Sequence, residues 1–193
     1  MKIDPKFVIK VAGTLTVISL ITAALLGLVD GVTRDKIAEI EAEKTRVAMS
    51  AVTPEGSEFT DALEISEDVV AAASAQGGKV VELYGVKAGG YVMKVNASGS
   101  QGTIVMMVGV DANKAITGIS VVSHAETSGI GTKVVGNEPT ANGVGVLDQF
   151  VGLSGAGSLT VGGNVAPISG ATVSTKGIAT GANAALAAAE ALG

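Results

Sequence analysis

Several residue types are missing or scarce in this chain of 193 residues. It has no cysteine and no tryptophan, and aromatic side chains make up 3% of it. Without cysteine there is no disulfide, no thiolate metal site and no cysteine-ligated iron–sulfur cluster, so any redox chemistry must come from a bound cofactor. Nucleic-acid binding usually needs aromatic stacking platforms and basic residues, whereas this chain has few aromatic rings and a net charge of −5. We therefore expect neither DNA nor RNA as a partner.

Charged residues are also missing from one long stretch, Val11–Val29. At about 1.5 Å per residue it spans roughly 28 Å, close to the hydrocarbon thickness of a bilayer. We predict a transmembrane helix over residues 11–29. The lysines of the preceding segment, residues 1–10, place that end in the cytoplasm, so the chain is expected to cross the cell (inner) membrane once with its C-terminal part outside. A cleaved signal peptide is the alternative, but its apolar core is usually only about 7–15 residues long.

The residues that follow predict a stalk helix and a linker over residues 30–60. Thr33 is placed to cap a helix that runs to Ala51, with oppositely charged side chains three positions apart on its polar side. After a loop, a second helix is predicted from Asp61 to Gln76, where two glycines end it. We assign residues 61–193 to a single domain.

Four segments rich in β-branched residues predict strands in this domain, at residues 80–86, 91–97, 103–110 and 116–123. Their short connections favour an antiparallel meander. The run Ile104–Val110 is almost entirely apolar, which predicts a strand buried on both faces. A helical piece at 146–151, a strand at 159–161 and a final helix ending at Leu192 complete the prediction of an α+β fold.

The final helix is preceded by a segment rich in hydroxyl side chains, Ser169–Thr175, which places Thr172 at the helix N-terminus. The first amide groups of a helix lack carbonyl partners and carry partial positive charge, so this position suits an anion such as a phosphate. A simpler interpretation is that one of these hydroxyl groups caps the helix, since serine and threonine are common caps.

A second group of polar residues lies in the loop after the last predicted strand. It contains the only histidine, His124, followed by Glu126 and by the two glycines Gly129 and Gly131. Loops at the edge of a rigid sheet often carry ligand contacts. One histidine with one nearby glutamate is a weak indication of metal or acid–base chemistry, and the ligand spacing of a zinc site is missing, so no metal is expected.

These two segments resemble the FMN-binding subunits of Rnf-type and Na⁺-pumping quinone reductase complexes. The sequence Ser-Gly-Ala-Thr at 169–172 is similar to the family's flavinylation motif, although Ala166 stands where an aspartate is usual. In the loop, His124, Glu126, Thr127, Gly129 and Gly131 match a His-x-Glu-Thr-Pro-Gly-x-Gly pattern, with Ser128 in place of proline. Further similarities lie at residues 33–37, 90–91, 106–111 and 116–119. The short chain resembles the Rnf G subunit more than the longer quinone reductase C subunit.

The resemblance implies an extracytoplasmic domain that carries FMN, joined to Thr172 through a phosphoester. A separate flavin transferase would attach it, because the chain shows no group that would activate the hydroxyl. The residues expected around the cofactor are Thr172, Ser169, Gly170, Ala171, Ser174, Thr175, His124, Glu126, Thr127, Gly129, Ile130, Gly131 and Lys133. Glu126 and Lys133 are candidates to tune the flavin, and Ile130 to pack against it.

The resemblance further implies a subunit that relays electrons, without a complete active site of its own. Its partners would be other membrane subunits of a ferredoxin:NAD⁺ oxidoreductase that drives Na⁺ or H⁺ translocation. A cofactor-free, membrane-anchored scaffold subunit is the alternative, and Ala166 is its main support. An exported flavoprotein reductase with its own substrate is less favoured, because no acid–base pair marks a substrate site.

Overall fold

The computed structural model describes residues 5–193, which divide into two compact units at the boundary between Glu43 and Lys44. Lys2 of the expected cytoplasmic segment lies outside the described residues. The first unit belongs to helix α1 (Pro5–Ala51), which is long and apolar enough to cross a membrane, and its apolar part is not buried within the protein. The hydroxyl groups of Thr14, Thr16 and Thr22 each donate to a carbonyl one turn back at 2.9 Å, so they cost little in an apolar surrounding.

The expected cap at Thr33 is wrong, because α1 continues without a break through this residue. The Thr33 hydroxyl donates to the carbonyl of Val29 at 2.8 Å and lies inside the helix. An ion pair between Asp30 and Arg34, at 2.7 Å, links adjacent turns across this point. Gly31 alone costs about 1 kcal/mol of helix propensity, which is too little to end a long helix. The division of the chain at residues 10, 29 and 60 stays a prediction.

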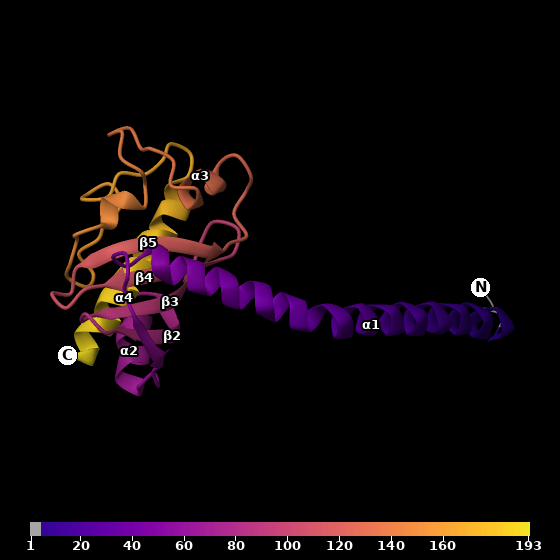
Figure 1. The fold of residues 1–193 in the computed structure, drawn as a ribbon. Helices are drawn as coiled ribbons and strands as arrows, with labels where there is room; N and C mark the ends of the chain where they lie inside the picture. Colours follow the sequence, from indigo (N-terminus) through magenta and orange to yellow (C-terminus); the bar gives the residue numbers. More distant parts are fainter. Residues whose placement is uncertain (1–4) are drawn as a thin grey trace. The chain divides into compact units, whose positions relative to one another are not determined.

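The second unit, Lys44–Gly193, is built on a five-stranded antiparallel sheet in which the strands pair in chain order (Figure 1). The strands are β1 (Phe59–Ala62), β2 (Gly78–Val86), β3 (Tyr91–Ser98), β4 (Thr103–Val110) and β5 (Ile116–Ser123). This confirms the α+β class and the meander of the four predicted strands.

The helix predicted from Asp61 is shorter than expected. Residues up to Ala62 belong to β1 and pair with β2, and the Thr60 hydroxyl accepts a hydrogen bond from the Gly85 amide at 3.0 Å. Helix α2 (Glu67–Ala75) begins only after Ser66, whose hydroxyl caps it by accepting from the Val69 amide. Glu67 and Asp68 then lie in the first turn, where the helix dipole favours negative charge.

Both faces of the sheet are covered within this unit. Helix α4 (Thr172–Leu192) and α2 pack on one face, where Met106 and Val108 of β4 join the main hydrophobic core. The last turns of α1 cover the other face, where Ala48 and Met49 pack with Met107. Strand β4 is therefore buried on both faces, as its apolar run predicts.

The rest of the chain forms loops with two short helices, α3 (Gly131–Val135) and the 3₁₀ helix η1 (Asp148–Phe150), the second of which confirms the predicted helical piece. The predicted strand at 159–161 is wrong: the segment makes only one isolated bridge, between Val161 and Val165. The backbone of Leu159 instead pairs with the buried side chain of Asn183, which accepts from its amide at 3.2 Å and donates to its carbonyl at 2.9 Å.

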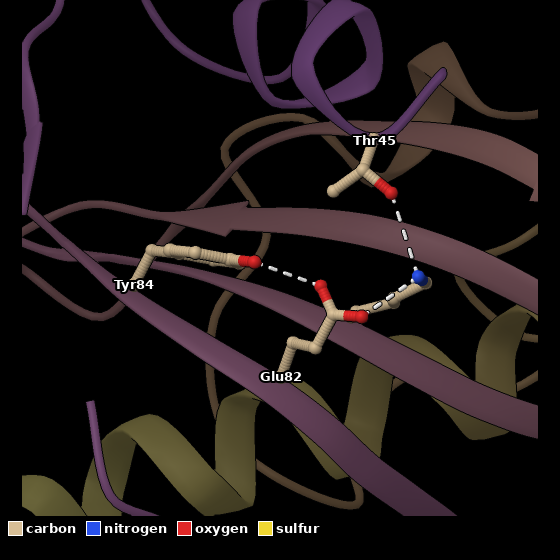
Figure 2. Close-up of polar contacts among 4 residues, drawn as sticks. Thr45, Glu82 and Tyr84 are labelled. Atoms are coloured by element: carbon tan, nitrogen blue, oxygen red, sulfur yellow. Dashed lines mark hydrogen bonds and ion pairs between the residues drawn. The ribbon is translucent and has the colours of Figure 1, made fainter. Parts of the chain in front are cut away.

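A polar cluster lies where the end of α1 covers the sheet, as Figure 2 shows. The Lys94 ammonium donates to Glu82 at 2.8 Å and to the Thr45 hydroxyl at 3.4 Å, and the Tyr84 hydroxyl donates to the other Glu82 oxygen at 2.8 Å. Burial, with the hydrogen bond to Glu82 and its charge, raises the pKa of Tyr84 to about 12. The cluster gives the half-buried Lys94 a charge partner in Glu82.

Candidate functional site

The two segments singled out in the sequence meet in one cavity of about 270 Å³ at the start of α4. Its lining consists of Ser100, Glu126, Thr127, Ile130, Gly131, Gly170, Ala171, Thr172, Val173 and Ser174. A larger cavity of about 410 Å³ lies among the 53–57 loop and the β2–β3 and β4–β5 turns, and none of the predicted site residues lines it. The smaller cavity is the candidate site, because it holds the N-terminus of α4 and the hydroxyl group of Thr172.

Helix α4 begins without a side-chain cap. The capping position is Ala171, so the interpretation that a serine or threonine caps this helix is wrong. The first amide of the helix to find a carbonyl is that of Thr175, which donates to Ala171 at 3.0 Å. Among the described residues, the amides of Thr172, Val173 and Ser174 have no hydrogen-bond partner. Three free donors and the positive end of the helix dipole therefore lie together at the cavity.

The hydroxyl groups of the segment differ in their availability. Thr172 is exposed, and its hydroxyl makes no hydrogen bond among the described residues. Thr175 is fully buried, and its hydroxyl donates to the Ala171 carbonyl at 3.0 Å. Ser174 is 2% exposed, and its hydroxyl donates to Glu126. Ser169 is exposed but lies outside the cavity lining. Thr172 is the one lining residue of the helix whose hydroxyl is both free and accessible.

Glu126 is the buried charged residue of the site, 7% exposed. One carboxylate oxygen accepts from the amides of Ser100, at 2.8 Å, and Gln101, at 3.3 Å, in the β3–β4 turn. The other accepts from the Ser174 hydroxyl. Three donors from two distant parts of the chain therefore offset the cost of burying this carboxylate.

Other predicted residues surround the cavity without lining it. His124 is exposed, and its Nδ1 accepts from the Glu126 amide at 3.2 Å, which shapes the loop. Gly129 has a φ of 80°, a left-handed conformation that glycine adopts without strain, and its amide donates to the Thr132 hydroxyl at 2.9 Å. Lys133 lies 3.9 Å from Glu138 and is therefore paired away from the cavity. The roles expected for these residues stay predictions.

Three contributors were missed in the sequence. Ser100 and Gln101 act through backbone amides, which no side-chain pattern reveals. Val173 lines the cavity and is 57% exposed, and the apolar Ile130, another lining residue, is 49% exposed. Its position next to Thr172 at the helix N-terminus is the signal that could have identified it.

The position that departs from the resembling motif, Ala166, is held by its backbone. The Gln149 side chain accepts from the Ala166 amide at 2.8 Å and donates to its carbonyl at 3.0 Å. Asn137, another residue of the loops around the site, has a φ of 55° and accepts from the Leu147 amide at 2.7 Å. Within the loop that leads to α4, the backbone of Ala166 is thus held by the Gln149 side chain.

Comparison with known proteins gives a consistent result. Residues 99–187 match the model of the FMN-binding domain. The chain is 35% identical over 184 residues to the G subunit of the ion-translocating oxidoreductase complex of Methanosarcina acetivorans, covering 91% of this chain and 90% of that protein. It is 32% identical over 200 residues to the G subunit of the Na⁺-translocating ferredoxin:NAD⁺ oxidoreductase complex of Acetobacterium woodii, covering 95% of this chain and 92% of that protein. The G subunit of the ion-translocating oxidoreductase complex of Aliivibrio fischeri is 26% identical to it over 125 residues, covering 62% of this chain and 60% of that protein.

Proposed function

This chain belongs to the family of G subunits of ion-translocating (Rnf-type) oxidoreductase complexes, and from that premise we propose that Thr172 carries a covalently bound FMN used for electron transfer. The chain has the family's FMN-binding domain and a helix that can anchor it in a membrane. The observation that carries the proposal is the uncapped start of α4, where three free amides and the free Thr172 hydroxyl meet in one cavity.

The residues present suit the phosphate end of a flavin nucleotide. The amides of Thr172, Val173 and Ser174 can donate to phosphate oxygens, and the helix dipole favours their negative charge. The cavity of about 270 Å³ is smaller than the roughly 300–1,000 Å³ of pockets that enclose a whole ligand. The exposed side chains of Ile130 and Val173 at its edge are the candidates for apolar contact with the flavin ring.

Attachment requires a co-reactant and a separate enzyme. The Thr172 hydroxyl would lose its proton and its oxygen would bond to the FMN phosphorus of FAD, while the pyrophosphate bond breaks and AMP leaves with the displaced oxygen. No described residue is placed to remove the proton from Thr172, so a flavin transferase must supply the base. The product is a phosphoester that keeps the flavin on the chain even when its free concentration is low.

The flavin supplies the electron-carrying chemistry, and this chain holds it in place. Partners are the other membrane subunits of the complex. By analogy with the relatives, the complex would transfer electrons between ferredoxin and NAD⁺ and translocate Na⁺ or H⁺. We place the N-terminus in the cytoplasm and the domain outside, on the basis of the lysines before the apolar stretch. A cofactor-free scaffold is the alternative, but it gives no reason for an uncapped helix start beside a free hydroxyl.

Expression with and without a flavin transferase tests the proposal. After denaturing electrophoresis, the protein made with the transferase should fluoresce as flavin, and its intact mass should rise by one FMN less one water. Thr172→Ala should abolish both signals, whereas Thr180→Ala, a control farther along the same helix, should retain them. Wild-type protein that stays dark with an active transferase would favour the scaffold, and fluorescence retained in Thr172→Ala would place the attachment elsewhere.

A further inference from the structure

Glu126 joins three segments that are far apart in the sequence. Its carboxylate accepts two backbone amides of the β3–β4 turn, and 48 residues later in the chain the Ser174 hydroxyl donates to its second oxygen. Ser174 stands two positions after Thr172, in the first turn of α4. The carboxylate therefore connects the sheet, through the loop after β5, to the turn of the helix that carries the proposed acceptor.

Two glycines show that the surroundings are shaped around this carboxylate. A methyl group at Gly131 would lie 2.6 Å from one Glu126 oxygen and 3.2 Å from the Ser174 hydroxyl. A methyl group at Gly99 would collide with the other Glu126 oxygen. Any larger side chain at either position would displace the carboxylate. Both carboxylate oxygens are thus enclosed by the chain itself.

These contacts point to a role different from flavin tuning. Both Glu126 oxygens already accept hydrogen bonds from the protein. The position of the carboxylate therefore serves to connect segments of the chain to one another. The hydrogen bond also engages the Ser174 hydroxyl with Glu126, and no bond from this hydroxyl to the amides at the start of α4 is found. Thr172 then remains the available hydroxyl in that turn, and the amides remain free for the phosphate.

We propose that Glu126 is a positioning residue for flavin attachment: by binding Ser174 it fixes the first turn of α4 so that the Thr172 hydroxyl is presented to the transferase. The proposal rests on the proposed function, namely that Thr172 is the acceptor. In this role the contacts of Glu126 control how Thr172 is presented for flavin attachment, while the reacting oxygen belongs to Thr172 itself.

The proposal predicts a graded response to substitution. Ser174→Ala and Glu126→Ala each remove the hydrogen bond, and a bond to a charged group is strong enough that its loss should lower kcat of attachment about tenfold. Glu126→Gln should stay within about threefold of the wild type, since its carbonyl oxygen can accept the two turn amides and its NH₂ group can donate to Ser174. KM for the chain should change little, because the exposed surface around Thr172 is unaltered.

The experiment measures initial rates of FMN incorporation into the unmodified full-length chain in detergent, with purified transferase and FAD, at several chain concentrations. Ser128→Ala, an exposed serine in the same loop, and Glu64→Gln, an exposed glutamate outside the site, are the matched controls. Near-UV circular dichroism of the tyrosines verifies that each variant is folded. Peptide mapping verifies that the flavin is on Thr172.

The outcomes separate the two proposals. If wild type gains no flavin at all, the proposed function fails and this inference falls with it. If wild type is modified and Ser174→Ala is modified at the same kcat, the positioning role is overturned while the proposed function stands. A Glu126→Gln variant as slow as Glu126→Ala would show that charge, rather than the hydrogen bonds, is required. Should Glu126→Ala fail to fold, Ser174→Ala still decides.

Discussion

Gly177→Ala tests how closely α4 must approach the sheet beside the site. A methyl group at Gly177 would lie 2.7 Å from the Ser98 carbonyl oxygen and 3.2 Å from the Gly99 Cα, both of which are backbone atoms. Gly181, one turn later, offers a matched control, since its methyl group would lie 2.7 Å from the Met106 sulfur, at the flexible end of a side chain. The two substitutions make the same chemical change against neighbours of different stiffness.

The expected magnitudes follow from this difference. Replacing a helical glycine by alanine gains about 1 kcal/mol of helix propensity at either position. At Gly177 the gain is offset by roughly 1–3 kcal/mol of overpacking, because the helix must move off the sheet. At Gly181 the cost is only that of turning Met106, about 0.5–1.5 kcal/mol. We expect Gly177→Ala to destabilise the protein by about 1 kcal/mol, and Gly181→Ala to be nearly neutral.

A tyrosine signal reports on the unfolding of the sheet-containing unit alone, even in the full-length chain. Both tyrosines of the protein lie in this unit, Tyr84 in β2 and Tyr91 in β3, and there is no tryptophan. Tyrosine fluorescence during urea unfolding in detergent therefore reports on this unit and not on the apolar helix. With a slope of about 1–3 kcal/mol per molar urea, the Gly177→Ala midpoint should fall by about 0.3–1 M.

The same substitution should slow flavin attachment, because Ser98 and Gly99 lead directly to Ser100, whose amide binds Glu126. Equal midpoints for the two variants, or a Gly177→Ala midpoint above that of Gly181→Ala, would refute the argument that a rigid backbone contact sets the position of α4.

Three further predictions concern stability and topology. Tyr84→Phe should cost about 1 kcal/mol at pH 8 through the lost hydrogen bond to Glu82. Folding raises the pKa of Tyr84 from 10.0 to about 12, so the stability that Tyr84 contributes to the wild type is lost as pH rises across that window, and the variant has no such contribution to lose. The difference in urea midpoint between the two proteins should therefore narrow there, and a widening difference would contradict the assignment. Lys114→Met removes a 2.6 Å hydrogen bond to the Ala189 carbonyl near the end of α4 and should cost about 0.3–1 kcal/mol by the same urea assay, with no change in midpoint as the contrary result. Because the chain has no cysteine, a single cysteine at Ala141 should react with a membrane-impermeant maleimide in intact cells, whereas one at Phe7 should react only after lysis; the reverse pattern would invert the proposed orientation.

The membrane helix and the four long strands could be predicted from the sequence because each depends on a local pattern. The apolar run needs only its length, and β-branched segments separated by short turns need only pair with their neighbours in the chain. The location of Thr172 at a helix start was predicted for the same reason. The local pattern failed at Thr33, where a capping residue type lies inside a continuous helix, and at residues 61–62, where pairing with β2 prevails over helix propensity.

The sequence by itself thus determined the anchor, the meander and the hydroxyl that begins the last helix, since these follow from contacts between residues close together in the chain. Only the tertiary structure decided which donors surround Glu126. The amides of Ser100 and Gln101 carry no side-chain signal, and Ser174 lies 48 residues away from the carboxylate it binds. Such long-range hydrogen bonds arise when the packing of α4 on the sheet brings the three segments together, and they leave Thr172 as the free hydroxyl in the first turn of α4.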